Sequence, residues 1–63
     1  MCEADVYRIN DGREELIMAS VDILEPQDDE HWRIVGIFGD QKTLRGRIKA
    51  LNLGDHKIIF ETD

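Results

Sequence analysis

The chain has 63 residues, of which 41% are hydrophobic and 35% are charged, and its formal net charge at pH 7 is −6. A chain of this length predicts one domain over residues 1–63, near the lower size limit for a domain that folds alone. No apolar run approaches the ~20 residues of a membrane span, and the sequence does not open with a basic region followed by an apolar one. We therefore expect a cytoplasmic protein with no membrane span and no signal peptide.

Charge is divided unequally between the two halves of the chain. Residues 1–31 contain ten acidic and two basic side chains, whereas residues 32–63 contain four acidic and six basic ones. An acidic protein binds nucleic acid poorly, because neutralising phosphates requires a basic surface. Nucleic acid is therefore not expected as a general partner, and any such contact would have to use the C-terminal half.

The first segment has the alternation of a strand. Residues 2–9 place Cys2, Ala4 and Val6 on one face, with charged side chains on the other. Asn10-Asp11-Gly12 then predicts a tight hairpin turn, because Asp-Gly readily supplies the positive φ angles that such a turn needs. Cys2 thus begins a predicted strand on its apolar side.

Residues 13–25 are compatible with two structures. Apolar residues at helical spacing, together with a capping-box pattern at Asp11 and Glu14, would suit a helix. Two short apolar runs favour instead two strands with a break near residues 19–20. The second strand should end at Pro26, which cannot donate to a strand ladder.

The most β-like run is Trp32–Phe38, which follows a polar, acidic turn at residues 27–30. Its β-branched and aromatic side chains are typical of strands. Gly36 within it predicts a bulge or a close backbone approach. Gly39-Asp40 predicts the next turn.

From Lys42 the sequence alternates cleanly, which predicts one strand with Arg45, Arg47 and Lys49 on a single face. The apolar pattern then shifts by one position after Ala50, as a bulge would produce. A turn at Gly54-Asp55 leads into a last predicted strand, Lys57 to Glu61. Short strands with turns about ten residues apart predict an all-β fold, a small barrel or sandwich of five to seven strands.

Cys2 is the only cysteine, so the chain cannot form an intramolecular disulfide. A domain this small often needs a metal or a partner subunit for stability. Cys2 could be a small buried hydrophobic residue. Alternatively its thiolate could chelate a metal with a nearby nitrogen, either its own α-amine after removal of Met1 or the Met1 amine and the Cys2 amide. Such donors favour nickel, copper or zinc, and two copies of the chain would suit square-planar Ni(II).

Other candidate residues carry weaker signals. His31 and His56 lie in predicted turns beside charged residues, where solvated roles are usual, and no spacing links them to each other or to Cys2. Arg45, Arg47 and Lys49 could meet phosphates or simply form a solvated face. The aromatic residues suffice for a small core and need not stack on bases. No nucleophile–base set and no glycine-rich phosphate loop is present, so we expect no enzyme.

Several pieces of the sequence, spread over essentially its whole length, resemble one family. They are Met1-Cys2-Glu3, Glu14-Glu15-Leu16, Leu24-Glu25-Pro26, Ile37-Phe38-Gly39-Asp40-Gln41-Lys42 and Asp55-His56-Lys57-Ile58. In these pieces, their order and the total length, the sequence resembles the CooT family of small nickel-binding proteins.

The resemblance implies a small all-β fold, an SH3- or Sm-like barrel of five to seven short strands, and a homodimer. Members bind nickel through the cysteine after the initiator methionine, and some assist nickel insertion into carbon monoxide dehydrogenase. The resemblance thus implies one Ni(II) held between two subunits by Cys2 thiolates and N-terminal nitrogens, including that of Met1. The chain would be a metallochaperone or nickel sensor whose partners are a nickel enzyme or its maturation machinery. The alternative is an Sm-like RNA-binding module that uses Arg45, Arg47 and Lys49.

Overall fold

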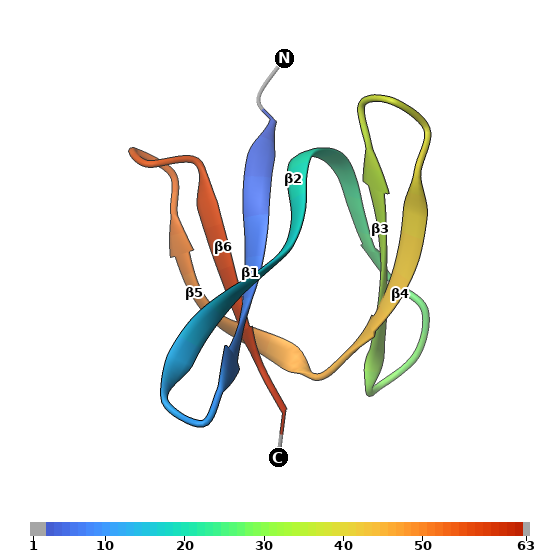
Figure 1. Ribbon diagram of the computed structural model, residues 1–63. Helices are drawn as coiled ribbons and strands as arrows, with labels where there is room; N and C mark the ends of the chain where they lie inside the picture. The colour runs from blue at the N-terminus through green and yellow to red at the C-terminus, as the bar shows by residue number, and fades with distance from the viewer. Residues whose placement is uncertain (1–2, 63) are drawn as a thin grey trace.

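The computed structural model describes residues 3–62, which form six β-strands and contain no helix that could span a membrane. The strands are β1 (Ala4–Asn10), β2 (Arg13–Pro26), β3 (His31–Gly36), β4 (Gln41–Arg45), β5 (Arg47–Asn52) and β6 (Lys57–Glu61). They form one sheet in the order β4-β3-β2-β1-β6-β5, in which β1 and β6 run parallel (Figure 1). The all-β prediction is confirmed, although the sheet does not close into a barrel, since β4 and β5 remain its two edges.

The hairpin between β1 and β2 follows from the chemistry of its turn. Asn10 pairs with Arg13, so the loop consists of two residues, Asp11 at φ 53° and Gly12 at φ 76°. Two consecutive positive φ angles suit a turn whose twist matches that of the flanking strands. The predicted turn is confirmed.

β2 is one bent strand rather than a helix or two separate strands. Its first part pairs with β1 and its second part with β3, and Val21 pairs with both, opposite Ala4 and Gly36. The bend lies at Ser20, whose φ is 55°. The break was therefore predicted at the right place, but the strand continues through it and ends at Pro26.

β3 ends at Gly36, two residues earlier than predicted, because the chain turns there towards β4. The Gly36 N–H donates to the Asp40 carbonyl at 2.8 Å, and the Gly39 N–H donates to the Gly36 carbonyl at 2.9 Å. A Cβ atom on Gly36 would lie 2.6 Å from Asp40 Oδ1. The glycine in this strand predicted that another group would approach its backbone closely, and that group is the Asp40 side chain.

The prediction of one continuous strand from Lys42 to Ala50 is wrong. The chain breaks at Gly46, whose φ of 130° takes it from β4, which pairs with β3, to β5, which pairs with β6. An irregularity in the pairing of β5 lies between Ile48 and Ala50, slightly before the predicted shift. The bounds predicted for the last strand are those of β6.

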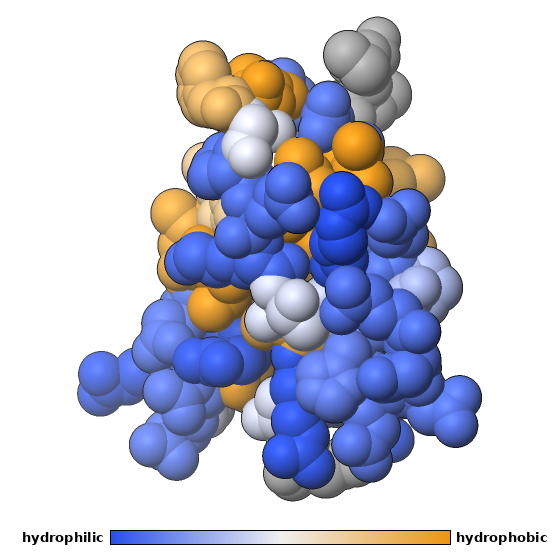
Figure 2. All heavy atoms as spheres, turned by 90° about the vertical axis from the view of Figure 1, so that its right-hand side faces the viewer, coloured by the Kyte–Doolittle hydropathy of each residue, from blue (hydrophilic) through white to orange (hydrophobic). Residues whose placement is uncertain are grey.

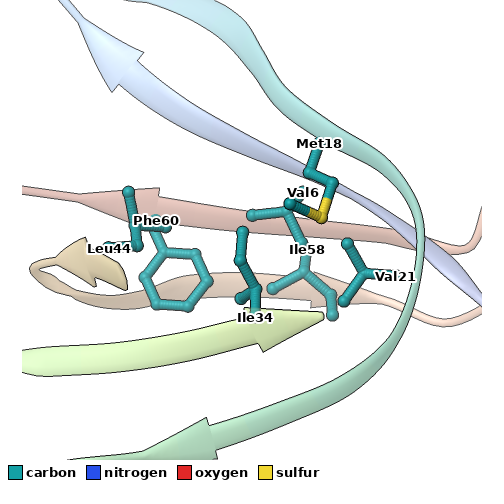
Figure 3. Close-up of a cluster of buried hydrophobic side chains, with 7 residues drawn as sticks. All are labelled: Val6, Met18, Val21, Ile34, Leu44, Ile58 and Phe60. Atoms are coloured by element: carbon teal, nitrogen blue, oxygen red, sulfur yellow. The ribbon is translucent and has the colours of Figure 1, made fainter. Parts of the chain in front are cut away.

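Seven buried hydrophobic side chains form the core on the concave side of the sheet (Figure 3). They are Val6, Met18, Val21, Ile34, Leu44, Ile58 and Phe60. Phe60, Ile34 and Val6 are fully buried. The Trp32 ring packs edge-on against the Phe60 ring, with the ring centroids 5.7 Å apart. Burying one large apolar side chain contributes about 1.5–3 kcal/mol, so this cluster supplies much of the free energy of folding.

Candidate functional site

One end of the sheet brings together four segments that are distant in sequence (Figure 1). We call it the amino-terminal end, because β1 begins there. It comprises residues 3–5, the bend of β2 at residues 20–21, the β3–β4 turn at residues 36–40 and the β5–β6 turn at residues 53–56.

Hydrogen bonds join these four segments through Asp5. The Asp5 N–H donates to the His56 carbonyl at 2.8 Å, and Asp5 Oδ1 accepts the Ser20 N–H at 3.0 Å. The Ser20 carbonyl in turn accepts the Ile37 N–H at 2.9 Å. The start of β1 is therefore tied directly to the β5–β6 turn and to the bend of β2, and through Ser20 to the β3–β4 turn.

Two residues at this end have an unusual backbone conformation. Ser20 and His56 have φ angles of 55° and 53°, in the left-handed region that residues other than glycine seldom adopt. Such a conformation costs on the order of 1–3 kcal/mol and persists only where its surroundings enforce it, as they do at many functional sites. Both residues are direct hydrogen-bond partners of Asp5.

The amino-terminal end also exposes large apolar side chains. Phe38 in the β3–β4 turn is 88% exposed, and Leu53 in the β5–β6 turn is 78% exposed. Figure 2 shows apolar residues gathered towards this end and polar residues over the opposite one. Large apolar side chains exposed at one end of a small protein make that end a candidate for contact with a partner.

The predicted metal ligands, Met1 and Cys2, lie outside the described residues. The first described residue, Glu3, is exposed and directly precedes β1. Between residues 3 and 62, no group of three or more His, Cys, Asp or Glu side chains could hold a metal ion.

The structure places the two histidines differently. His56 lies at the amino-terminal end, in the turn before β6. His31 begins β3 at the other end of the sheet, where its Nδ1 lies 2.9 Å from Asp28 Oδ1. His31 therefore contacts the β2–β3 loop and is remote from the start of β1.

The Asp28 carboxylate organises that loop, and its titration can be tested. Its pKa is held below the ordinary value of 3.8, first by the Glu30 backbone N–H and then by the His31 side chain. The resulting stabilisation is complete above pH 3.8 and is lost as the pH falls through the lowered pKa. We expect the Asp28 midpoint, measured by carboxyl NMR, to stay below 3.8 in His31→Ala. A return to 3.8 would identify His31 as the main cause.

The predicted basic row is divided between two strands. Arg45 lies in β4, whereas Arg47 and Lys49 lie in β5. Arg45 Nη2 is 3.9 Å from a Glu30 carboxylate oxygen, and Arg47 Nε is 3.3 Å from one of Glu61. Charged residues on edge strands discourage pairing with other chains. These carboxylates and the edge position weigh against a phosphate-binding role.

The aromatic side chains also offer little for base stacking. Trp32 and Phe60 pack together in the core, and the Lys57 ammonium lies 4.8 Å from the centroid of the Tyr7 ring. Phe38 is exposed, but it stands on the β3–β4 turn, away from the basic residues of β5.

Sequence reasoning missed the residues that organise the amino-terminal end. Asp5 lies between Ala4 and Val6, and this alternation predicts only that its side chain faces solvent. Ser20 was recognised as a break, but its partner was not. Phe38 was assigned to a strand, although the Gly39-Asp40 turn signal directly after it could have indicated an exposed turn position.

Comparison with known proteins gives a consistent result. The family model described as CO dehydrogenase accessory protein CooT matches residues 1–61. Among solved structures, the chain is similar to a CooT candidate from Carboxydothermus hydrogenoformans, with 39% sequence identity over 98% of each chain and a TM-score of 0.88. No curated protein matches the chain. The match extends over almost the whole sequence, and the chain therefore belongs to the CooT family of CO dehydrogenase accessory proteins.

Proposed function

We propose that this chain is a cytoplasmic nickel-binding protein that carries or senses Ni(II) for the maturation of carbon monoxide dehydrogenase. Two copies of the chain hold one Ni(II) between them as cargo. The donors are the two Cys2 thiolates and N-terminal nitrogens of Met1 and Cys2. The accessory role follows from the family, and the nickel site and the dimer are the added proposal.

The chemistry of the donor set supports this metal. Thiolate and nitrogen ligands suit late first-row transition metals better than magnesium or calcium. One chain supplies too few strong donors for a closed tetrahedral zinc site. Four donors from two chains match the square-planar arrangement that nickel(II) accepts.

The observation that carries the dimer is the exposed apolar surface at the amino-terminal end. Cys2 precedes β1 by two residues, and Phe38 and Leu53 are largely exposed at the end where β1 starts. A second copy that covers these side chains also brings a second Cys2 towards the first. Dimerisation and metal binding thus use the same end of the molecule.

Substitution of Cys2 tests the metal site. Titration of the native protein with Ni(II) should produce thiolate charge-transfer absorption that saturates at one ion per two chains, and Cys2→Ser should abolish it. Because the thiol must lose its proton to bind the metal, the native affinity should also fall as the pH is lowered.

Two histidine variants serve as controls for this titration. His31 lies at the end of the sheet opposite the amino-terminal end, so His31→Ala should bind nickel as the native protein does. His56→Ala tests whether the histidine at the amino-terminal end contributes a donor. Equal nickel binding by the native protein and Cys2→Ser would disprove the proposed site.

A further inference from the structure

Asp5 lies at an irregularity in the pairing of β1 with β2. Ala4 pairs with Val21, but Val6 pairs with Met18, so the register shifts around Asp5. On the other side, Asp5 pairs regularly with Lys57 of β6. Bulges of this kind often stand beside functional sites, where they redirect a side chain or the strand itself.

The Asp5 side chain acts on the backbone at this irregularity. Its Oδ1 accepts the N–H of Ser20, the residue at which β2 bends. The described residues hold no ion pair to Asp5, and the Lys57 ammonium instead contacts Glu14. The contact observed is a hydrogen bond from a backbone N–H to an oxygen of the Asp5 side chain, which an amide oxygen could also accept.

The second contact of Asp5 fixes the other neighbour of β1. Its N–H donates to the carbonyl of His56, which also has a left-handed backbone. Both partners of Asp5 thus adopt a conformation that is unfavourable in isolation. These contacts hold the start of β1 against the bend of β2 on one side and the β5–β6 turn on the other.

We propose that Asp5 is a positioning residue for the metal site. It is not a metal ligand but holds the start of β1, so that the Cys2 residues of two copies meet at a fixed separation. This role builds on the proposed nickel site, although its main test requires no nickel.

The test uses Cys2 as the attachment point for a nitroxide label, because the chain has no other cysteine. Distances between the two labels of a dimer are measured by pulsed electron paramagnetic resonance. We expect a narrow distribution for the native chain and for Asp5→Asn, which retains an Oδ1 acceptor. Asp5→Ala, which removes it, should broaden the distribution at least twofold. Asp29→Ala, which removes an exposed carboxylate from the remote β2–β3 loop, is the control and should resemble the native chain.

A second measurement separates positioning from ligation and from a purely structural role. In unlabelled protein, Asp5→Ala should weaken nickel binding at least tenfold, whereas Asp5→Asn should stay within a few-fold of the native protein. If Asp5→Asn lost as much affinity as Asp5→Ala, the carboxylate charge would matter and the proposal would be wrong. Should Asp5→Ala fail to fold, Asp5→Glu, which displaces the carboxylate by one methylene, replaces it in both measurements.

Identical label distributions in the native chain, Asp5→Asn and Asp5→Ala would overturn the positioning role. Loss of stability in Asp5→Ala with unchanged label distances and nickel affinity would also overturn it. Failure of the nickel site itself would appear separately, as equal nickel binding by the native protein and Cys2→Ser.

Discussion

Replacing Phe38 and Leu53 by serine should convert the proposed dimer into a monomer. These side chains are 88% and 78% exposed in the single chain, and a two-fold interface buries each of them twice. Burying one such side chain contributes about 1.5–3 kcal/mol, so four half-buried copies contribute roughly 3–6 kcal/mol. The dissociation constant of the double variant should therefore rise about a hundredfold or more, since every 1.4 kcal/mol is tenfold. Sedimentation equilibrium over a concentration series measures this change.

Leu16→Ser is the matched control for the double variant. Leu16 is 53% exposed and pairs with Tyr7 across the β1–β2 ladder, away from the amino-terminal end. Its substitution should leave the dimer intact. If Leu16→Ser dissociated the dimer and the Phe38/Leu53 variant did not, the interface would lie on the outer face of the sheet. The proposed arrangement of the two Cys2 residues would then be wrong.

The parts of the fold that were predicted correctly depend on local chemistry. Asp11-Gly12 supplies two positive φ angles whatever the rest of the chain does. Pro26 ends a strand because it lacks an N–H. Gly54-Asp55 precedes a strand whose alternating apolar residues, among them Ile58 and Phe60, face the core.

The parts that were missed depend on contacts between distant segments. Lys42 to Ala50 alternates as a single strand would, but β4 and β5 lie at opposite edges of the sheet, and the chain breaks between them at Gly46. Similarly, the role of Asp5 depends on Ser20, fifteen residues further along the chain. No local pattern encodes either relationship.

The candidate site also contains one part that local chemistry predicts and one part that depends on the fold. Cys2 was selected from its position and chemistry, and its assignment as a ligand stays a prediction. The exposed apolar side chains at the amino-terminal end could not be predicted, because Phe38 and Leu53 become part of one end only after the sheet has formed. The basic part of the charge asymmetry lies on the two open edges, since β4 and β5 carry four basic residues and no acidic one.

Substitution of Gly46 by alanine should destabilise the fold severely. Its φ of 130° is unfavourable for any residue with a Cβ atom, and that atom would overlap the carbonyl oxygen of Glu61 and lie 3.2 Å from Thr62 Cγ2. Backbone strain of about 1–3 kcal/mol adds to an overpacking cost of about 1–3 kcal/mol. Since a core of this size supplies only roughly 3–5 kcal/mol, the combined cost is comparable with the whole stability, and a substantial fraction of the variant should be unfolded at 25 °C. Urea denaturation followed by Trp32 fluorescence measures the loss.

Gly12→Ala is the control that separates the cost of a positive φ angle from the cost of steric overlap. Gly12 also has a positive φ, 76°, but a Cβ atom there would meet nothing within 4 Å. Its substitution should therefore cost only about 1–2 kcal/mol from the backbone conformation. Gly46 has a second task, because its N–H donates to the Glu30 carbonyl at 2.7 Å and so joins the β4–β5 corner to the β2–β3 loop. Equal losses for the two variants would show that Gly46 contributes only its backbone freedom, whereas a much larger loss for Gly46→Ala would show that the close approach to Glu61 excludes a side chain at the β4–β5 corner.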